Sequence, residues 1–217
     1  MSERFLVLDK FNTFYDWDLV LTELDVTPPE PKTNYVELDG MNGTLDLSES
    51  LTGEVVFKDR TLTASFWTST GSRCDRSLLL RDIITALHGR KIKIIVPDDP
   101  IHYFYGRVKV KSVTNLIPYT EFKIEVTCDP WRYSNSHISR SFVVSEATDL
   151  ILNNNGVRTL IPMITVSGTV NLICGNASVS LTDGSYKVSD FKLYRGSNII
   201  KVSGNGSVMF TYQEADL

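Results

Sequence analysis

The sequence predicts a mainly β protein with one helix, an α+β fold. We expect an N-terminal antiparallel β-sandwich or barrel-like domain that carries the helix, followed by a small C-terminal all-β sandwich. Several segments alternate strictly between apolar and polar residues, one segment has helical periodicity, and the composition shifts near residue 134 toward Val, Ser, Gly and Asn. The chain has 217 residues, of which 42% are hydrophobic, which is enough for a sizeable core.

Alternation is clearest from Tyr119 to Cys128, in the run YTEFKIEVTC. The preceding run YGRVKVKSV also alternates, and the link between the two runs contains Asn115 and Pro118. Together they predict a hairpin over residues 107–127 with cross-strand ion pairs, because one strand is basic and the other acidic on the outer face. RTLTASFW and KIKIIV predict two further strands.

The run DRSLLLRDIITALHGRK predicts a helix over about residues 75–88. Apolar residues recur there at helical spacing: Leu79, Leu80, Ile83, Ile84 and Leu87. Asp75 or Ser77 can cap its start, and Gly89 suits the left-handed position after its end. A single amphipathic helix among strands must lie on a sheet.

The segment VTPPEPKTNY, from Val26 to Tyr35, contains Pro28, Pro29 and Pro31. Proline fixes φ and removes a donor from a β-ladder, so residues 26–35 are expected to form an extended arm or loop. The DGMNG sequence that follows contains two glycines, Gly40 and Gly43, which permit positive φ in a tight connection.

The composition divides the chain into an N-terminal domain at residues 1–133, a linker at 134–141 and a C-terminal β-sandwich at 142–217. Short apolar runs and turn residues follow one another regularly in the last part. Turns are predicted at Ser167-Gly168 and at Gly204-Asn205-Gly206. The run NIIKVSGNGSVMFTY then predicts a hairpin with its turn at the second of these.

Charge and hydropathy narrow the function classes. A net charge of −4 argues against specific nucleic-acid recognition, which needs a broad basic surface. No stretch has the roughly 20 apolar residues of a membrane span, and the start MSERFLVLDK lacks a signal-peptide core. We therefore expect folding in a cytoplasm, without membrane association.

No catalytic, cofactor or metal site is predicted. The three cysteines are widely spaced and fit neither a disulfide framework nor a zinc site, so they are expected to be buried apolar residues or idle thiols: Cys74, Cys128 and Cys174. The three histidines occur without a GxSxG motif or another nucleophile pattern: His88, His102 and His137. Asp98-Asp99 could bind a cation or act as an acid and base, but PDDP is better explained as a turn. DGMNGTLDLSE fails the EF-hand spacing.

The order of these segments resembles the siphophage and prophage distal tail protein family, Dit. The resemblance rests on an N-terminal strand, a polar arm and the DG…G.LDLSE.LTG.V.…RTLT.SF pattern, followed by a helix closing on LHG, a strand through PDDP..YF.GRV, the alternating FKIEV strand and CDPWRY. It covers residues 1–133. From Phe142 on, the family usually carries a galectin-like or carbohydrate-module-like β-sandwich, and NNNG at Asn153–Gly156 followed by IPMITVSG is similar to the start of that domain.

The resemblance implies a structural virion protein at the tip of a long non-contractile tail, assembled in the host bacterial cytoplasm. Its implied partners are copies of itself in a hexameric ring, the tail tube protein, the tail-associated lysin or fibre hub, and receptor-binding proteins. We expect the arm to be the main interface, with the 107–127 hairpin second. The interface residues inferred on this basis are Pro28, Pro29, Pro31, Tyr35, Arg107, Lys109, Glu121 and Lys123.

The alternative hypothesis is a carbohydrate-binding module that acts in adhesion to the host surface. It requires exposed aromatic residues on the C-terminal domain, and the sequence offers Tyr186, Phe191, Tyr194, Phe210 and Tyr212. An enzyme is the third hypothesis, and the chain lacks the acid and base constellation that it would need.

Overall fold

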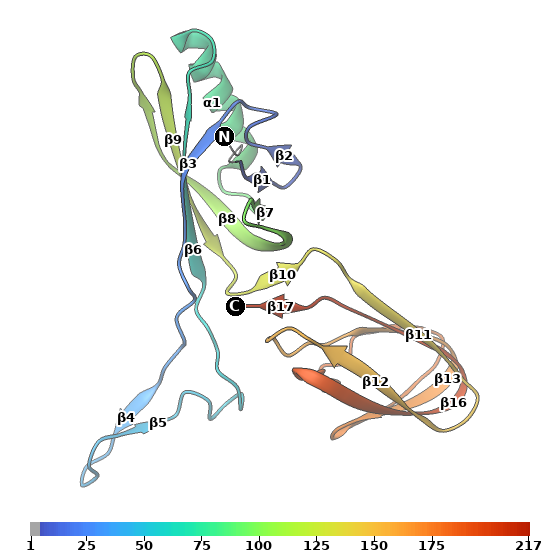
Figure 1. The fold of residues 1–217 in the computed structure, drawn as a ribbon. Coiled ribbons are helices and arrows are strands. Elements are labelled where there is room, and N and C mark those ends of the chain that lie inside the picture. The colour runs from blue at the N-terminus through green and yellow to red at the C-terminus, as the bar shows by residue number, and fades with distance from the viewer. Residues whose placement is uncertain (1–4) are drawn as a thin grey trace. The chain divides into compact units, whose positions relative to one another are not determined.

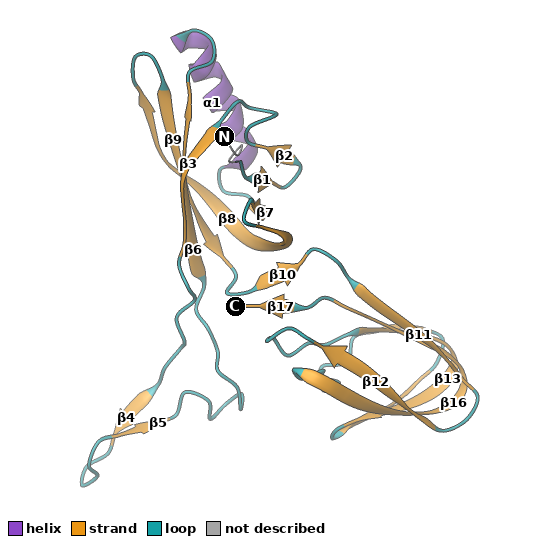
Figure 2. Ribbon diagram, in the orientation of Figure 1, coloured by secondary structure: helices purple, strands orange, loops and turns teal. Residues whose placement is uncertain are grey.

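The structure is a computed structural model that describes residues 5–217, and its chain divides into two compact units. Unit 1 comprises the chain through Arg132 together with Leu217, and unit 2 comprises Tyr133–Asp216. Figure 1 labels most of the elements, and Figure 2 shows that strands dominate both units. The described residues contain one helix. The fold class predicted from the sequence, mainly β with one helix, is confirmed.

The elements of unit 1 are β1 (Val7–Leu8), β2 (Phe11–Asn12), β3 (Val20–Val26), β4 (Tyr35–Glu37), β5 (Thr44–Asp46), β6 (Arg60–Thr68), α1 (Arg73–Leu87), β7 (Lys91–Val96), β8 (Asp99–Asn115) and β9 (Thr120–Cys128). Seven of these strands form an antiparallel sheet in the order β2-β1-β7-β8-β9-β6-β3. β4 and β5 pair only with each other among the described residues.

The core of unit 1 lies between this sheet and α1. Alternation along β6 and β9 places Phe66 and Phe122 opposite each other on one face, with ring centroids 6.1 Å apart. The apolar face of α1 covers them with Leu80, Ile83 and Leu87, all buried. Burying a side chain of this size stabilises the fold by about 1.5–3 kcal/mol, which is why the helix lies on this face.

The helix begins at Arg73, two residues earlier than the sequence predicts. Its N-cap is Ser72, whose hydroxyl accepts from Asp75 N at 3.2 Å, while the Asp75 carboxylate accepts from Ser72 N at 2.9 Å. This capping box uses Asp75 at the third helical position, so the expectation that Asp75 or Ser77 is the cap is wrong. Gly89 has a φ of 78°, as predicted for the residue after the helix.

The predicted hairpin over residues 107–127 is confirmed as β8 paired with β9. A bulge between Val110 and Ser112 shifts the pairing by one residue. The expected cross-strand ion pair is present between Lys111 Nζ and Glu125 Oε2, at 3.0 Å. The PDDP sequence is also a turn as predicted, since Val96 at the end of β7 pairs with Asp99 at the start of β8.

The remaining strands belong to unit 2, apart from the first residue of β10: β10 (Arg132–Ser134), β11 (Ile138–Val144), β12 (Thr148–Asn154), β13 (Met163–Cys174), β14 (Ala177–Leu181), β15 (Gly184–Tyr186), β16 (Gly196–Tyr212) and β17 (Ala215–Asp216). β10 pairs with β17, and Ser134 N donates to Glu214 O at 2.9 Å. The predicted linker at 134–141 is wrong in its second half, because β11 begins at Ile138 and pairs with β16.

Unit 2 is built on two long strands, β13 and β16, that pair with each other along most of their length. The first half of β16 pairs with β12 and its second half with β11. Likewise β15 pairs with the first half of β13 and β14 with its second half. One layer therefore contains β11, the second half of β16, the first half of β13 and β15, and the other contains β12, the first half of β16, the second half of β13 and β14. Each long strand contributes to both layers. The core between the two layers includes Ile164, Leu172, Ile200 and Phe210.

The turns predicted at Ser167-Gly168 and Gly204-Asn205-Gly206 are wrong, because these residues lie inside β13 and β16. Gly168 and Gly206 are directly paired and have φ of 97° and 153°. A Cβ at Gly206 would lie 2.1 Å from Ser167 O, so only glycine permits this approach. Glycine here marks a bend within a strand pair, and the predicted hairpin is one continuous strand.

Two of the three cysteines are buried side chains, so their presence is explained by packing without a chemical role. Cys128 and Cys174 are buried and Cys74 is exposed. Burial raises the pKa of Cys128 to about 12, and it also raises the pKa of Cys174. Since the thiolate is the nucleophile, about one Cys128 thiol in ten thousand is ionised at pH 8.

We expect Ellman's reagent at pH 8 to modify Cys74 rapidly in the native protein and to reach Cys128 and Cys174 only after unfolding in guanidinium chloride. The measurement is the thiol count with time, with and without denaturant, and a Cys74→Ser variant as control. Rapid native labelling of that variant would contradict the burial of the other two thiols.

Candidate assembly interface

The connection between β3 and β6 is a two-legged projection, which we call the ribbon and define as residues 27–59. Its legs leave the sheet paired, since Thr27 N donates to Thr61 O and Thr61 N donates to Thr27 Oγ1, both at 3.0 Å. Figure 1 shows the legs continuing from β3 and β6 to the β4–β5 hairpin. The predicted arm at 26–35 is thus the first leg of a longer antiparallel element.

Proline is compatible with the first leg because of its register. Pro31 lies opposite Phe57 in a bridge that needs no hydrogen bond from position 31. The bonds lie on either side, from Lys58 N to Glu30 O and from Lys32 N to Val56 O, both 2.7 Å. Lys58 Nζ and Glu30 Oε2 also form an exposed ion pair at 3.0 Å, which contributes little to the stability of the ribbon.

Beyond this bridge the ribbon closes in the β4–β5 hairpin. Tyr35 pairs with Asp46, Val36 with Leu45 and Glu37 with Thr44. Gly40 and Gly43 at the tip have φ of 84° and 82°, which confirms their prediction as turn glycines. A Cβ at either would meet no atom within 4 Å, so the need for glycine there is conformational and not steric.

A second loop, residues 48–55, is held at the base of the hairpin by Ser48. Its hydroxyl donates to Asp46 Oδ1 at 2.5 Å and accepts from Asn34 N at 2.9 Å, and Ser48 N donates to Asp46 Oδ1 at 2.9 Å. These bonds from the Ser48 side chain and backbone lower the pKa of Asp46. The loop therefore has a defined conformation although it is exposed.

The ribbon carries many exposed apolar side chains for its size. Tyr35 is 58% exposed and Leu51 is 96% exposed. The complete set of large ones within the ribbon is Tyr35, Leu38, Met41, Leu45, Leu51 and Val55. A two-stranded ribbon cannot bury these groups by itself, and an exposed apolar cluster beside free strand edges is typical of an interaction surface.

The other predicted interface residues lie on the sheet and not on the ribbon. The face of β8 and β9 opposite the core contains Arg107, Lys109, Glu121 and Lys123. These four residues share one face but lie in two pairs along it, with Arg107 and Lys109 opposite Thr127 and Glu125, and Lys123 and Glu121 opposite Ser112 and Thr114. The other four, Pro28, Pro29, Pro31 and Tyr35, share the ribbon. The Arg107 guanidinium already makes a hydrogen bond within unit 1, because its Nη1 donates to Gly89 O at 2.5 Å.

That sheet face has a hollow of about 640 Å³. Trp67 and Tyr119 lie at it with ring centroids 6.4 Å apart in an edge-to-face arrangement, and Glu23, Glu121 and Lys123 supply the charges. β3 lines the hollow and is an edge strand of the sheet, with one side unpaired among the described residues. The hollow and this edge form a second surface with the features of an interface.

Sequence reasoning missed the second leg and the apolar residues of the ribbon beyond Tyr35. In LDGMNGTLDLSESLTGEVVF these residues stand singly among Gly, Ser and Asp, without the period-two pattern of a buried strand. Apolar residues without a periodic pattern, in a segment flanked by strands, are the signal that could have identified them.

Two of the three histidines considered as chemical candidates, His88 and His102, make hydrogen bonds within unit 1. His88 Nδ1 accepts from Val110 N at 3.1 Å, which ties the helix end to β8. His102 Nδ1 lies 2.7 Å from Asp99 Oδ1, and Arg132 Nη1 donates to the other oxygen of Asp99 at 3.2 Å. Both carboxylate oxygens of Asp99 are therefore engaged by side chains of unit 1. No group of three or more potential metal ligands occurs among the residues described.

Across the part of the chain that the structure covers, no helix is long and apolar enough to cross a bilayer. These features define a two-unit, mainly β protein with a helix-covered sheet, a projecting ribbon and a separate β-sandwich. No protein-family model matches the chain, and no curated protein matches it significantly in sequence.

A solved structure with this architecture is the crystal structure of the SPP1 Dit (gp 19.1) protein, described as a paradigm of the hub adsorption apparatus in Gram-positive infecting phages. The TM-score is 0.70 at 15% sequence identity, and the match covers 96% of this chain and 98% of the SPP1 chain. The chain therefore has a Dit-like fold, with both units represented in the match.

Proposed function

We propose that this chain is a structural protein of the tail tip of a long-tailed phage. In this role it forms a hexameric ring that joins the tail tube to the receptor-binding apparatus, and it is assembled in the host cytoplasm without enzymatic activity. The observation that carries the proposal is the Dit-like fold over 96% of the chain and 98% of the SPP1 protein. A match over both units supports a function like that of the SPP1 protein more strongly than a match to a single common domain would.

The exposed surfaces support a ring. A closed ring needs a heterologous interface, in which one surface of each copy binds a different surface of the next. Unit 1 offers two such surfaces, the apolar ribbon and the sheet face with its hollow and open β3 edge. We propose that the ribbon of one copy binds the sheet face of its neighbour, through strand addition and burial of its apolar side chains.

The proposed ring predicts a defined mass. Native mass spectrometry of the full chain should show six copies of the 24.4 kDa subunit, and negative-stain images should show rings with a central hole. A monomer at every concentration up to the solubility limit would contradict the proposal. A ring of another size would retain the assembly role and correct the stoichiometry.

A further inference from the structure

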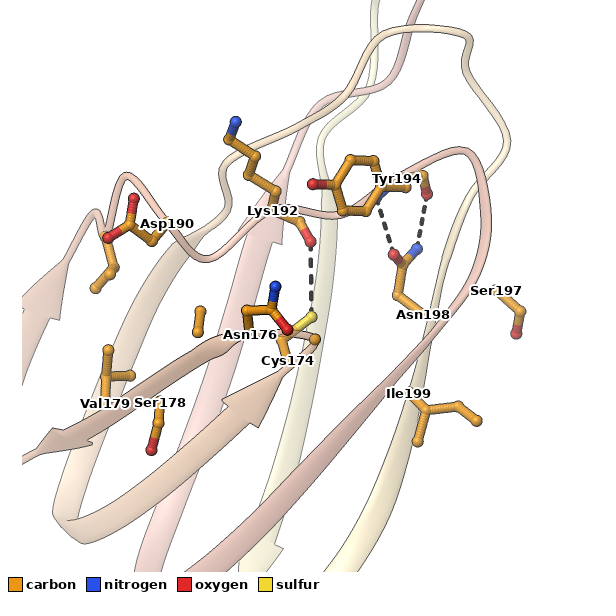
Figure 3. Close-up of a pocket in the computed structure, with 13 residues that line it drawn as sticks. Cys174, Asn176, Ser178, Val179, Asp190, Lys192, Tyr194, Ser197, Asn198 and Ile199 are labelled. Atoms are coloured by element: carbon orange, nitrogen blue, oxygen red, sulfur yellow. Dashed lines mark hydrogen bonds between the residues drawn. The ribbon is translucent and has the colours of Figure 1, made fainter. Parts of the chain in front are cut away.

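Unit 2 contains a hollow of about 770 Å³ that the assembly role does not use. It lies between the β13–β14 turn, the connection from β15 to β16, and the start of β16. Figure 3 shows Asn176, Lys192 and Tyr194 around it, with Asp190 at one side and Ile199 at another. Its volume is within the range of pockets that hold small molecules, roughly 300–1,000 Å³.

One aromatic side chain is presented at this hollow. Of the aromatic residues considered for sugar binding, Phe191, Phe210 and Tyr212 are buried and Tyr186 packs against the core, whereas Tyr194 is 55% exposed. An exposed tyrosine beside a polar hollow offers an apolar ring face next to hydrogen-bonding groups. This is the combination that a pyranose needs, because its ring has apolar C–H faces and a polar rim.

The turn that carries Tyr194 is fixed by a buried side chain. Asn198 Oδ1 accepts from Tyr194 N at 2.8 Å. Asn198 Nδ2 donates to Tyr194 O at 2.8 Å, to Gly196 O at 3.1 Å and to Leu152 O at 3.3 Å. Since Asn198 is only 8% exposed, these bonds are protected from water. The Tyr194 ring therefore projects from a rigid backbone, which lowers the entropy cost of binding.

The polar groups at the hollow are available. The side chains of Asn176, Asp190 and Lys192 make no hydrogen bond or ion pair with any described residue. They supply an amide, an acceptor and a donor, so both functions of a hydroxyl group can be matched. The charges of Asp190 and Lys192 offset each other, which favours a neutral ligand over a phosphate or a cation.

We propose that this hollow is a binding site for a neutral saccharide, with one pyranose ring stacked on Tyr194 and its hydroxyls bonded to Asn176, Asp190 and Lys192. The inference does not rest on the proposed assembly role, because it concerns unit 2 alone. A site of this kind would let the protein contact glycans of a cell surface directly.

The test uses the full chain and saturation-transfer NMR. The probes are the methyl pyranosides of glucose, galactose, mannose and N-acetylglucosamine at millimolar concentration, with adenosine as a second class of stacking ligand. We expect saturation transfer to at least one pyranoside. Tyr194→Ala should weaken its binding about tenfold, while Tyr194→Phe, which keeps the ring, should stay within about threefold of the wild type.

The matched control is Tyr15→Ala in unit 1, because Tyr15 is 66% exposed, has the same chemistry and lies outside the ribbon and the sheet face. It should leave saccharide binding unchanged, and thermal unfolding by circular dichroism checks that both variants fold. Absence of transfer to every pyranoside overturns the proposal, as does transfer that Tyr194→Ala leaves intact. Binding of adenosine alone would also overturn it. The subunit number of Tyr194→Ala, measured by native mass spectrometry, separates failure of this site from failure of the ring.

Discussion

Replacing residues 33–55 by Asn-Gly is expected to abolish ring formation and leave a folded monomer. Lys32 N donates to Val56 O at 2.7 Å across the two legs, so a two-residue turn can close the ribbon at this pair. Asn-Gly favours the type I′ turn that such a connection needs. The change removes the β4–β5 hairpin, the 48–55 loop and every large exposed apolar side chain of the ribbon: Tyr35, Leu38, Met41, Leu45, Leu51 and Val55.

The expected magnitude follows from the interface energetics. Loss of two side chains that each contribute about 2 kcal/mol to association weakens it roughly a thousandfold. Stability of the monomer should change little, because the removed segment adds none of the buried residues of the unit 1 core. Native mass spectrometry gives the subunit number, and far-UV circular dichroism gives the midpoint of unfolding.

The control is Val143→Ala, which trims an apolar residue of unit 2 that is also highly exposed, and which should assemble like the wild type. If the shortened chain forms the same oligomer as the full chain, the ribbon is not the interface. The sheet face of β8 and β9 would then be the remaining candidate, and substitution of Lys123 and Glu121 would test it.

Phe210→Ala is expected to destabilise unit 2 by about 3–5 kcal/mol, because the side chain is fully buried and leaves a cavity. Its ring stacks on Phe191 at 6.0 Å between centroids and meets Phe142 edge-to-face at 6.3 Å. Met209, its neighbour on the same strand, points to the opposite face and is partly exposed. Met209→Ala should therefore cost less than about 1 kcal/mol.

Two optical signals allow this measurement in the full chain. The three tryptophans are Trp17, Trp67 and Trp131, all of which belong to unit 1. Guanidinium unfolding followed by far-UV circular dichroism should show the loss in Phe210→Ala, while the tryptophan fluorescence transition stays at its wild-type midpoint. Equal losses in Phe210→Ala and Met209→Ala would contradict the assignment of Phe210 to the core.

Local sequence patterns predicted much of unit 1. The alternation from Tyr119 to Cys128 and the helical spacing of Leu80, Ile83 and Leu87 each depend on a single buried face, so periodicity alone reveals them. The N-cap was misplaced because Asp75 is a good cap in isolation. In the structure it is the third residue of a capping box whose first residue is Ser72.

Unit 2 was harder to predict because its glycines are used for long-range pairing. Gly204-Asn205-Gly206 has the local signature of a hairpin turn. What decides its conformation is the approach of β13, where Gly168 lies opposite Gly206 with no room for a side chain on either. No short window of sequence contains that information.

The candidate surfaces were predicted only in part. The prolines identified the first leg of the ribbon, since their effect on the backbone is local. The second leg, which includes Val56 and Phe57, owes its conformation to pairing with the first and has no independent signal. The hollow beside Tyr194 depends on Asn198 bonding to backbone groups of two other segments, which is a property of the folded unit.

The sharing of β13 and β16 between the two layers of unit 2 has a consequence for how that unit opens. A sandwich whose layers have separate strands can lose one layer while the other survives, but here separating either layer breaks strands that the other one requires. Amide hydrogens along both long strands should therefore share one opening free energy for exchange with solvent, that of complete unfolding. Such all-or-none behaviour would leave proteases few partially open forms to cut.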